Sequence, residues 1–185
     1  MLCLCSQSRS RALLLQEAGI AFVQKPVDFD EERIKATTAR DLVYLASKGK
    51  LEAAERAYGL YVPLLTADSV IELANGEIAR KPQTREEARV LLQKQSGSRI
   101  AIISCVHYKR RERLLVDLSA TAFTFDLFDE EAMEAYLASG EWQGAAGACM
   151  VEGFCKPYIR DMHGLESTAR GLQVEILKPW LEMSE

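Results

Sequence analysis

The stretch MLCLCSQSRSRALLLQEAG, residues 1–19, indicates the fold class. Met1–Cys5 is a short apolar run that predicts a strand, and the polar residues Ser6–Arg11 follow it. The apolar residues of Ala12–Ala18 then predict a helix that closes at Gly19. A strand, a polar turn and a helix in this order favour an α/β fold.

The rest of the chain continues to interleave strands with helices. Strands are predicted at Ile20–Val27, Tyr61–Leu65, Ser69–Leu73, Ile100–Tyr108, Leu114–Leu127 and Ala148–Arg160, with a hairpin at Asn75-Gly76. Helices are predicted within residues 31–58, with Gly49 as a break or cap, and at Arg85–Gln95, Asp129–Ser139 and Leu172–Met183, the last bent or interrupted at Pro179. We therefore expect an α/β fold with a mixed sheet, in one domain or two closely joined lobes.

The composition excludes several classes of protein. The 185 residues are 48% hydrophobic and 27% charged, which argues against a disordered or collagen-like chain and suffices for a buried core. A net charge of −4, from 23 basic and 27 acidic residues, is a poor match to a nucleic-acid polymer, which needs a strong positive field. A few placed cations would still be enough for an anionic small molecule.

No membrane or export signal is recognised. No stretch approaches the roughly 18–20 apolar residues that cross a bilayer, so no membrane insertion is expected, and the first apolar run is too short for a signal-peptide core. The five cysteines have no CxxC spacing, which favours reduced, buried thiols in a cytoplasmic protein over a metal or redox site.

Two further groups of residues are better explained by structure than by chemistry. The basic segment Lys109–Arg113 has no interleaved aromatic residues and is interpreted as a solvated turn rather than a nucleic-acid contact. His107 and His163 lack the spacing of a nucleophile with its base, so a structural role is predicted for both and covalent catalysis is disfavoured.

The first candidate site is the polar segment Ser6–Arg11. A strand that ends in hydroxyl and guanidinium groups just before a helix forms a typical anion site, because the helix N-terminus offers N–H groups and a positive dipole. The alternative is that Ser8 or Ser10 only caps the helix while Arg9 and Arg11 are solvated. The segment lacks the GxxxxGK[ST] pattern of a P-loop.

The second candidate site is a set of acidic residues. Asp30-Glu31 follows a predicted strand, and Asp68 interrupts an apolar run, where a buried carboxylate needs a cation or hydrogen-bond partners. Mg²⁺ held by carboxylates and substrate phosphates is one such partner. The alternative places Asp68 at a strand end facing water. Lys81 returns across the hairpin toward Asp68, which fits phosphate chemistry or an ordinary cross-strand ion pair.

Taken together, these segments resemble the Maf family of nucleoside triphosphate pyrophosphatases over nearly the whole chain. The family opening LAS-x-SPRR-x-x-LL resembles Leu4–Leu15, its DE pair matches Asp30-Glu31, and its GADT-V-V strand resembles Thr66–Ile71. Further matches are Arg80-Lys-Pro82, Glu86–Ala88 with Ser96-Gly97, Ala146–Gly153 and Gly171-Leu172. The resemblance implies a mixed, elongated and twisted sheet flanked by helices, with two lobes around a central cleft, in a single domain over residues 1–185.

The resemblance also implies a site and a reaction. Glu31 and Asp68 would bind a divalent cation, Mg²⁺ or Mn²⁺, Asp68 could activate water, and attack between the α- and β-phosphates would give the nucleoside monophosphate and pyrophosphate. The residues that would neutralise phosphate charge are Ser8, Arg11, Lys81 and either Lys48 or Lys50, and those near the base would be Ser10, Ser69 and Glu152. Glu152 would favour a guanine-type edge that presents N–H donors.

The sequence departs from the family pattern at several of these positions. Ser10 stands where the family has the first of two arginines, Ser69 where it has threonine, and Gly49 where it has a lysine, flanked by Lys48 and Lys50. The late segment 164–173 also differs. Non-standard or pyrimidine nucleoside triphosphates are the expected substrates, and the family implies a homodimer. The alternative is a catalytically weak nucleotide-binding protein that regulates cell division and septum formation.

Overall fold

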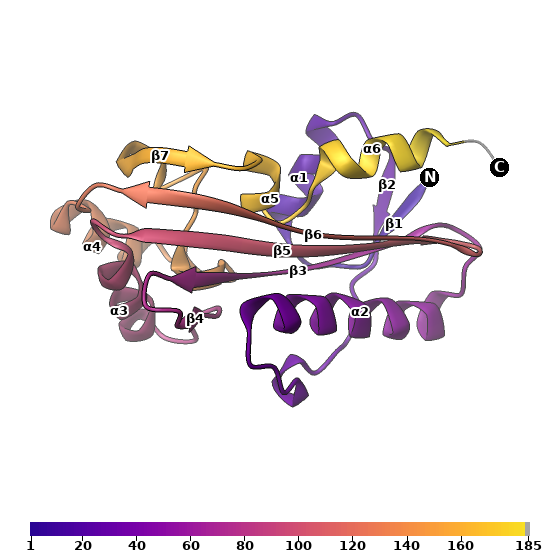
Figure 1. Ribbon diagram of the computed structural model, residues 1–185, viewed down its shortest axis with the longest axis horizontal. Coiled ribbons are helices and arrows are strands. Elements are labelled where there is room, and N and C mark those ends of the chain that lie inside the picture. The colour runs from indigo at the N-terminus through magenta and orange to yellow at the C-terminus, as the bar shows by residue number, and fades with distance from the viewer. Residues whose placement is uncertain (184–185) are drawn as a thin grey trace. The chain divides into compact units, whose positions relative to one another are not determined.

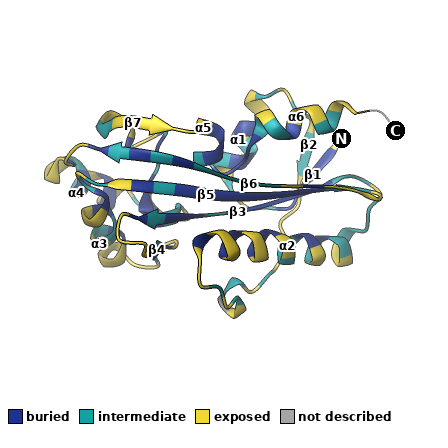
Figure 2. Ribbon diagram, viewed as in Figure 1, coloured by how far each residue is buried: buried dark blue, intermediate teal, exposed yellow. Residues whose placement is uncertain are grey.

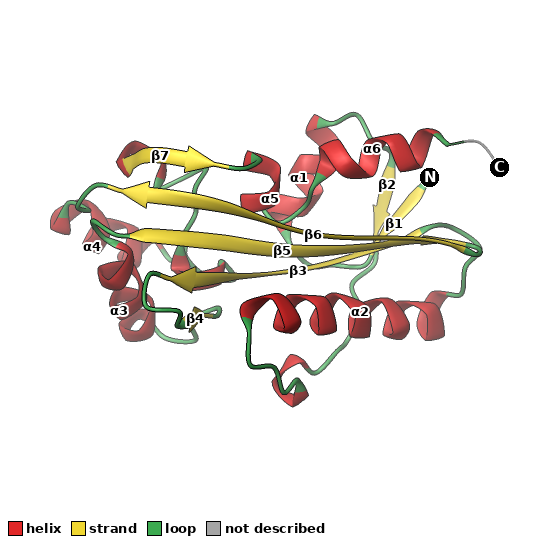
Figure 3. Cartoon of the chain, viewed as in Figure 1, coloured by secondary structure: helices red, strands yellow, loops and turns green. Residues whose placement is uncertain are grey.

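The computed structural model describes residues 1–183 and contains one mixed sheet with helices packed against it (Figures 1 and 3). The strands are β1 (Leu2–Leu4), β2 (Phe22–Gln24), β3 (Leu64–Leu73), β4 (Ile78–Ala79), β5 (Arg99–Arg110), β6 (Arg113–Phe125) and β7 (Ile159–His163). The α-helices are α1 (Arg9–Glu17), α2 (Ala39–Tyr58), α3 (Arg85–Gln95), α4 (Glu130–Ser139), α5 (Glu166–Ala169) and α6 (Val174–Glu182). Three 3₁₀ turns lie at Glu31–Arg33, Ala146–Ala148 and Lys156–Tyr158.

The strand order within the described residues is β2-β1-β3-β5-β6-β7, and β4 pairs with β3. β1 runs parallel to β2 and β3, whereas β4 and β7 run antiparallel to their neighbours. The predicted mixed α/β sheet flanked by helices is therefore confirmed. None of the helices in residues 1–183 is long and apolar enough to span a membrane.

The chain divides into two compact units. The first comprises Met1–Ser69, Ser104–Ser119 and the described residues from Gly171 onward, and the second comprises Val70–Ile103 and Ala120–Arg170. Each has its own core. That of the second unit gathers around Phe123 and Phe125, which are covered by residues of α3 and α4.

Alternation along β1 assigns the two faces of the sheet in the first unit. Leu2 and Leu4 pack into a core with Leu14 and Leu15 of α1 and Leu177 of α6, whereas Cys3 and Cys5 pack with Leu51 and Ala54 of α2. Side chains two residues apart share a face, so α1 and α6 cover one face and α2 covers the other (Figure 1). Within this part of the sheet, β1 and most of β3 are buried (Figure 2).

The same alternation continues in β3. Leu65 and Ala67 pack in the core beneath α1 and α6, whereas Leu64 packs on the α2 side. Asp68 has the parity of Leu64 and therefore faces α2, and Ser69 has the parity of Leu65 and faces α1. Two consecutive residues of one strand are thus directed toward two different helices.

Most predicted elements are confirmed with shifted ends. Ser8 caps α1, which begins three residues before the predicted helix, and β2 is shorter than Ile20–Val27. Gly76 adopts a left-handed conformation (φ 81°) in the predicted hairpin. Asp129 caps α4 by accepting a hydrogen bond from the backbone N–H of Ala132. Pro179 lies inside α6 without interrupting it.

The structure corrects the predictions for α2 and for β3. α2 runs through Gly49 without a break, although glycine in a helix interior costs about 1 kcal/mol relative to alanine. Residues 64–73 form the single strand β3 rather than two strands, because the Asp68 side chain has a cationic partner in α2.

Ala148–Arg160 is mostly not a strand. Gly147 and Ala148 both have positive φ values (58° and 59°), which a strand does not accept, and two 3₁₀ turns precede β7. The apolar residues of this segment, such as Val151 and Cys155, are buried in the core of the second unit without pairing as a strand. The prediction of a strand over this segment was therefore wrong for most of its residues.

Candidate functional site

The candidate site lies in the first unit, where β1 ends and β3 continues. The last register pair is Leu4 with Leu65, and the N–H of Cys5 donates to the carbonyl of Leu65 (2.8 Å). The chain runs from β1 through α1 to β2 on one side, and from β2 through α2 to β3 on the other. In open α/β sheets, ligands bind at the carboxyl ends of strands at such a switch point.

The turn after β1 leads into the N-terminus of α1. Ser8 is the N-cap and accepts a hydrogen bond from the backbone N–H of Arg11 (3.3 Å). The N–H of Ser8 in turn donates to the hydroxyl of Ser6 (3.2 Å). Ser8 therefore caps the helix, as one part of the alternative to an anion site predicted.

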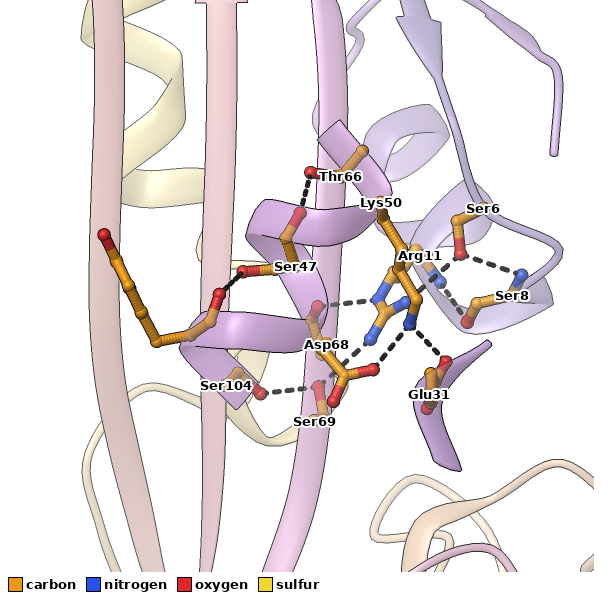
Figure 4. Close-up of polar contacts among 12 residues, drawn as sticks. Ser6, Ser8, Arg11, Glu31, Ser47, Lys50, Thr66, Asp68, Ser69 and Ser104 are labelled. Atoms are coloured by element: carbon orange, nitrogen blue, oxygen red, sulfur yellow. Dashed lines mark hydrogen bonds and ion pairs between the residues drawn. The ribbon is translucent and has the colours of Figure 1, made fainter. Parts of the chain in front are cut away.

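Arg11 is buried and not solvated, with only 7% of its surface exposed. Its Nε donates to the carbonyl of Gly171 (2.9 Å), one terminal nitrogen to the hydroxyl of Ser6 (3.1 Å) and the other to the hydroxyl of Ser69 (3.2 Å; Figure 4). Burial lowers the pKa of Arg11, and the carboxylates of Asp68 and Glu31 oppose this shift. Because an arginine stays protonated in proteins, these contacts fix a positive charge at the site.

Lys50 of α2 lies between two carboxylates. Its Nζ is 2.6 Å from Oδ1 of Asp68 and 2.6 Å from Oε1 of Glu31, which belongs to the 3₁₀ turn between β2 and α2 (Figure 4). Asp68 is only 4% exposed, so the alternative of a strand-end residue facing water is wrong. A buried carboxylate of this kind needs a cation, and the predicted need is met by Lys50.

Lys48 has a different partner. It pairs with Glu52 one turn further along the helix at 3.8 Å, and both side chains are about half exposed. The predicted pair of alternatives, Lys48 or Lys50, therefore corresponds to one lysine that contacts the acidic residues and one that contacts a surface glutamate.

Hydrogen bonds on both faces of the sheet hold the site in place. On the α1 face, the hydroxyls of Ser69 and Ser104 lie 2.8 Å apart, and the amide of Gln173 donates to the carbonyl of Ser104 (2.8 Å). On the α2 face, Thr66 donates to the carbonyl of Ser47 (2.8 Å) one turn before Lys50. These bonds tie α2, β3, β5 and the segment before α6 around the charged groups.

The two histidines have structural surroundings. His107 is buried, its Nδ1 lies 2.8 Å from the hydroxyl of Ser47, and burial lowers its pKa to about 4, with Lys48 adding to the shift. His163 lies on β7 in the second unit and pairs with Asp161 at 2.8 Å.

The structure brings together only part of the predicted set. Ser10 lies half-buried in the first turn of α1. Asp30 pairs with Arg33 on the surface (2.8 Å). Lys81 and Glu152 belong to the second unit. Their roles, like those of the other predicted residues, stay predictions.

Sequence reasoning did not assign a site role to Gly171 and Ser104, and it included Ser6 only as part of the polar segment Ser6–Arg11. Ser6 and Gly171 accept hydrogen bonds from Arg11, and Ser104 contacts Ser69. Gly171 has a positive φ of 96°, and a Cβ there would lie 3.1 Å from Ser69 and 3.2 Å from Arg11. That tight approach is a reason for glycine in the Gly171-Leu172 match to the family.

A divalent cation fits the donor set only together with a ligand. Within residues 1–183 there is no group of three or more histidine, cysteine or acidic side chains placed to hold a metal ion. Mg²⁺ is typically bound by one or two carboxylates plus substrate phosphates. Glu31 and Asp68, which converge on one ammonium group, supply two such carboxylates.

The fold and the site define an α/β protein with two cations and two carboxylates at a switch point of parallel strands. The family model described as Maf-like protein matches residues 1–183. The chain therefore belongs to the Maf-like family, as the resemblance predicted.

Named relatives agree with this assignment. A nucleoside triphosphate pyrophosphatase of Nitratiruptor sp. is 52% identical over 96% of this chain and 96% of its own length. An enzyme of the same name from Helicobacter pylori (strain Shi470) is 42% identical over 94% of this chain and 91% of its own length. Among solved structures, the Staphylococcus aureus Ham1 protein is 16% identical with a TM-score of 0.47, over 67% of this chain and 71% of its own. The named relatives confirm the predicted class of enzyme, a hydrolase.

Proposed function

We propose that this protein hydrolyses nucleoside triphosphates to the nucleoside monophosphate and pyrophosphate. The observation that carries the proposal is the position of Lys50 between Glu31 and Asp68, together with the buried Arg11, which binds Ser69, the residue that follows Asp68 in β3. The names of the Maf-like relatives support the reaction.

The two cations have distinct roles in this proposal. Arg11 is fixed by three hydrogen bonds, so its charge is in place before the ligand arrives and no reorganisation is needed. Lys50 has three N–H donors, of which two are directed to Glu31 and Asp68, and we assign the third to a phosphate oxygen. Both groups would stabilise the negative charge that develops on the phosphate oxygens and on the leaving pyrophosphate.

Asp68 is assigned the activation of water. Its Oδ1 accepts the bond from Lys50, and we assign Oδ2 to accept the proton of a water molecule that attacks the α-phosphorus. The bond to the bridging oxygen then breaks and pyrophosphate leaves.

Glu31 and Asp68 are also the residues that would hold a divalent cation. Such an ion supplies neutralisation of phosphate charge when it is bound. A metal requirement predicts that chelation with EDTA abolishes turnover and that added Mg²⁺ or Mn²⁺ restores it. Full activity in EDTA would remove the metal from the proposal and leave Lys50 and Arg11 as the charged partners.

The substrate class is proposed from the family resemblance. Ser10, Ser69 and Glu152 are assigned to the base, with non-standard or pyrimidine triphosphates as the substrates, and Lys81 is assigned to the phosphates. A carboxylate at Glu152 accepts hydrogen bonds, so replacement by glutamine should change the order of preference among bases rather than abolish turnover.

The test is pyrophosphate release from a panel that includes UTP, CTP, dTTP, ITP, GTP and 7-methyl-GTP, with Mg²⁺ or Mn²⁺. Wild type should turn over at least one of them, and Asp68→Asn should lose about a thousandfold or more in kcat. The matched control is Asp117→Asn, because Asp117 accepts a hydrogen bond from Ser119 (2.6 Å) and does not contact Lys50.

Folding must be verified in both variants by circular dichroism and thermal melting. A folded wild type with no turnover of any nucleotide would overturn the enzymatic proposal. Nucleotide binding without turnover, measured by calorimetry, would instead support the alternative of a binding protein.

A further inference from the structure

α2 contains a single glycine, Gly49, although helix propensity disfavours glycine inside a helix. Gly49 lies in the middle of a 20-residue helix, and glycine is less favourable there than any residue except proline. A methyl group at this position would overlap Cζ and Cε2 of Phe29 and lie 3.0 Å from its Cε1. The tip of the phenylalanine ring therefore rests directly on the helix backbone.

Phe29 belongs to the connection of residues 25–38 between β2 and α2, which carries Glu31. This connection is tied to α2 at several points along its length. Near its start, Tyr58 donates to the carbonyl of Pro26 (2.5 Å), and Val27 packs on the core that includes Leu51. Further along, Phe29 contacts Gly49 and Glu31 pairs with Lys50.

Phe29 and Glu31, two residues apart in the connection, thus contact the adjacent residues Gly49 and Lys50 of the helix. We propose that Gly49 is the docking position of Phe29 and that this contact holds Glu31 beside Lys50. Phe29 and Gly49 are then positioning residues for the carboxylate, a role that rests on the function proposed above for Glu31.

The geometry explains why a small residue is needed. Glu31 is partly exposed, with 39% of its side chain accessible, so its ion pair with Lys50 is weakened by solvent and by salt. An apolar ring seated on the helix adds an attachment that salt does not screen. Any side chain at position 49 would lift the ring and remove this attachment, while Lys50 would stay in the helix.

The test separates positioning from folding. In Gly49→Ala the half-buried ring can move into solvent, and alanine favours the helix, so the melting temperature should be unchanged or higher. The kcat for pyrophosphate release should nevertheless fall about tenfold or more. Wild-type kcat in Gly49→Ala would overturn the proposal, and so would a loss of kcat that parallels a loss of thermal stability.

A rescue variant tests the contact itself. Leucine at position 29 lacks the ring atoms that the new methyl group would meet, so Phe29→Leu combined with Gly49→Ala should regain part of the kcat lost in Gly49→Ala. Additive effects of the two changes would contradict a direct contact. Arg40→Ala, on the exposed face of α2, is the control for changes in this helix and should retain wild-type kcat.

A readout that needs no enzymatic activity distinguishes this proposal from the proposed function. Arg33 and Lys35 are exposed trypsin sites on the same connection. If the Phe29 contact holds this connection against α2, trypsin should cleave the connection in Gly49→Ala several times faster than in wild type. In the double variant Phe29→Leu with Gly49→Ala, cleavage should be slower than in Gly49→Ala. Equal cleavage rates would overturn the docking even in a protein that turns over nucleotides.

Discussion

Lys50 and Asp68 form an ion pair with 2.6 Å between Nζ and Oδ1, although they are 18 residues apart on a helix and a strand. Asp68 is buried in the middle of β3, and Lys50 reaches it from the face that α2 covers. The same ammonium group binds Glu31, so one side chain pairs with both predicted catalytic carboxylates.

This pair predicts different results for the two neighbouring lysines. Lys50→Gln should lower kcat by about a hundredfold or more and destabilise the fold by about 1–3 kcal/mol, because it leaves Asp68 buried without its cation. Lys48→Gln removes only a half-exposed pair with Glu52 and should change stability by less than about 0.5 kcal/mol. Urea unfolding and steady-state kinetics check both variants, and equal effects on kcat would contradict the assignment of Lys50.

Arg11 should not tolerate lysine. An ammonium group cannot reach Ser6, Ser69 and Gly171 at once in the geometry of the guanidinium, so Arg11→Lys should lower kcat at least tenfold and cost about 1–3 kcal/mol of stability. The matched control is Arg9→Lys in the same turn, where the side chain is exposed. Similar losses of stability in the two variants would argue against the three bonds as the cause.

His107 should make the fold sensitive to acid. Its pKa is about 4 in the folded protein and about 6.5 when unfolded, so below pH 6.5 the unfolded chain binds a proton that the folded chain does not. The free energy of unfolding should therefore fall as the pH drops from about 6.5 to about 4, by on the order of 3 kcal/mol from this group.

His107→Asn removes the titration and keeps a polar partner for Ser47. Urea unfolding of wild type and His107→Asn at several pH values between about 7.5 and about 4.5 measures the difference in slope. Parallel curves for the two proteins would show that His107 does not cause the acid sensitivity.

The thiols should be protected in the native protein. All five cysteines are buried, and burial raises the pKa of Cys5 to about 12 and that of Cys105 to about 11. The thiolate is the reactive form of cysteine, so a disulfide reagent at about pH 8 should react slowly with the native protein. In denaturant, the same reagent should react with all five thiols. Rapid reaction of the native thiols would contradict the packing of Cys3 and Cys5 beneath α2.

Sequence patterns were informative where the signal is local. The cap at Ser8, the hairpin at Gly76 and the strand within Met1–Cys5 depend on residues within a few positions of one another, and all are confirmed. Local patterns failed for Ala148–Arg160, because its apolar residues are buried by contacts with distant elements rather than by strand pairing. They also failed at Gly49, where a break or cap was predicted, whereas α2 continues and the ring of Phe29 packs on the glycine.

The sequence by itself determined the α/β class, the family resemblance and the residue types of the site, because motifs and periodicity are properties of neighbouring residues. The choice of Lys50 over Lys48 as the partner of Asp68 and Glu31 came only from the tertiary structure. So did the bonds from Arg11 to Gly171, 160 residues away, and to Ser69. Those contacts depend on which face of β3 meets which helix, and that is fixed by packing.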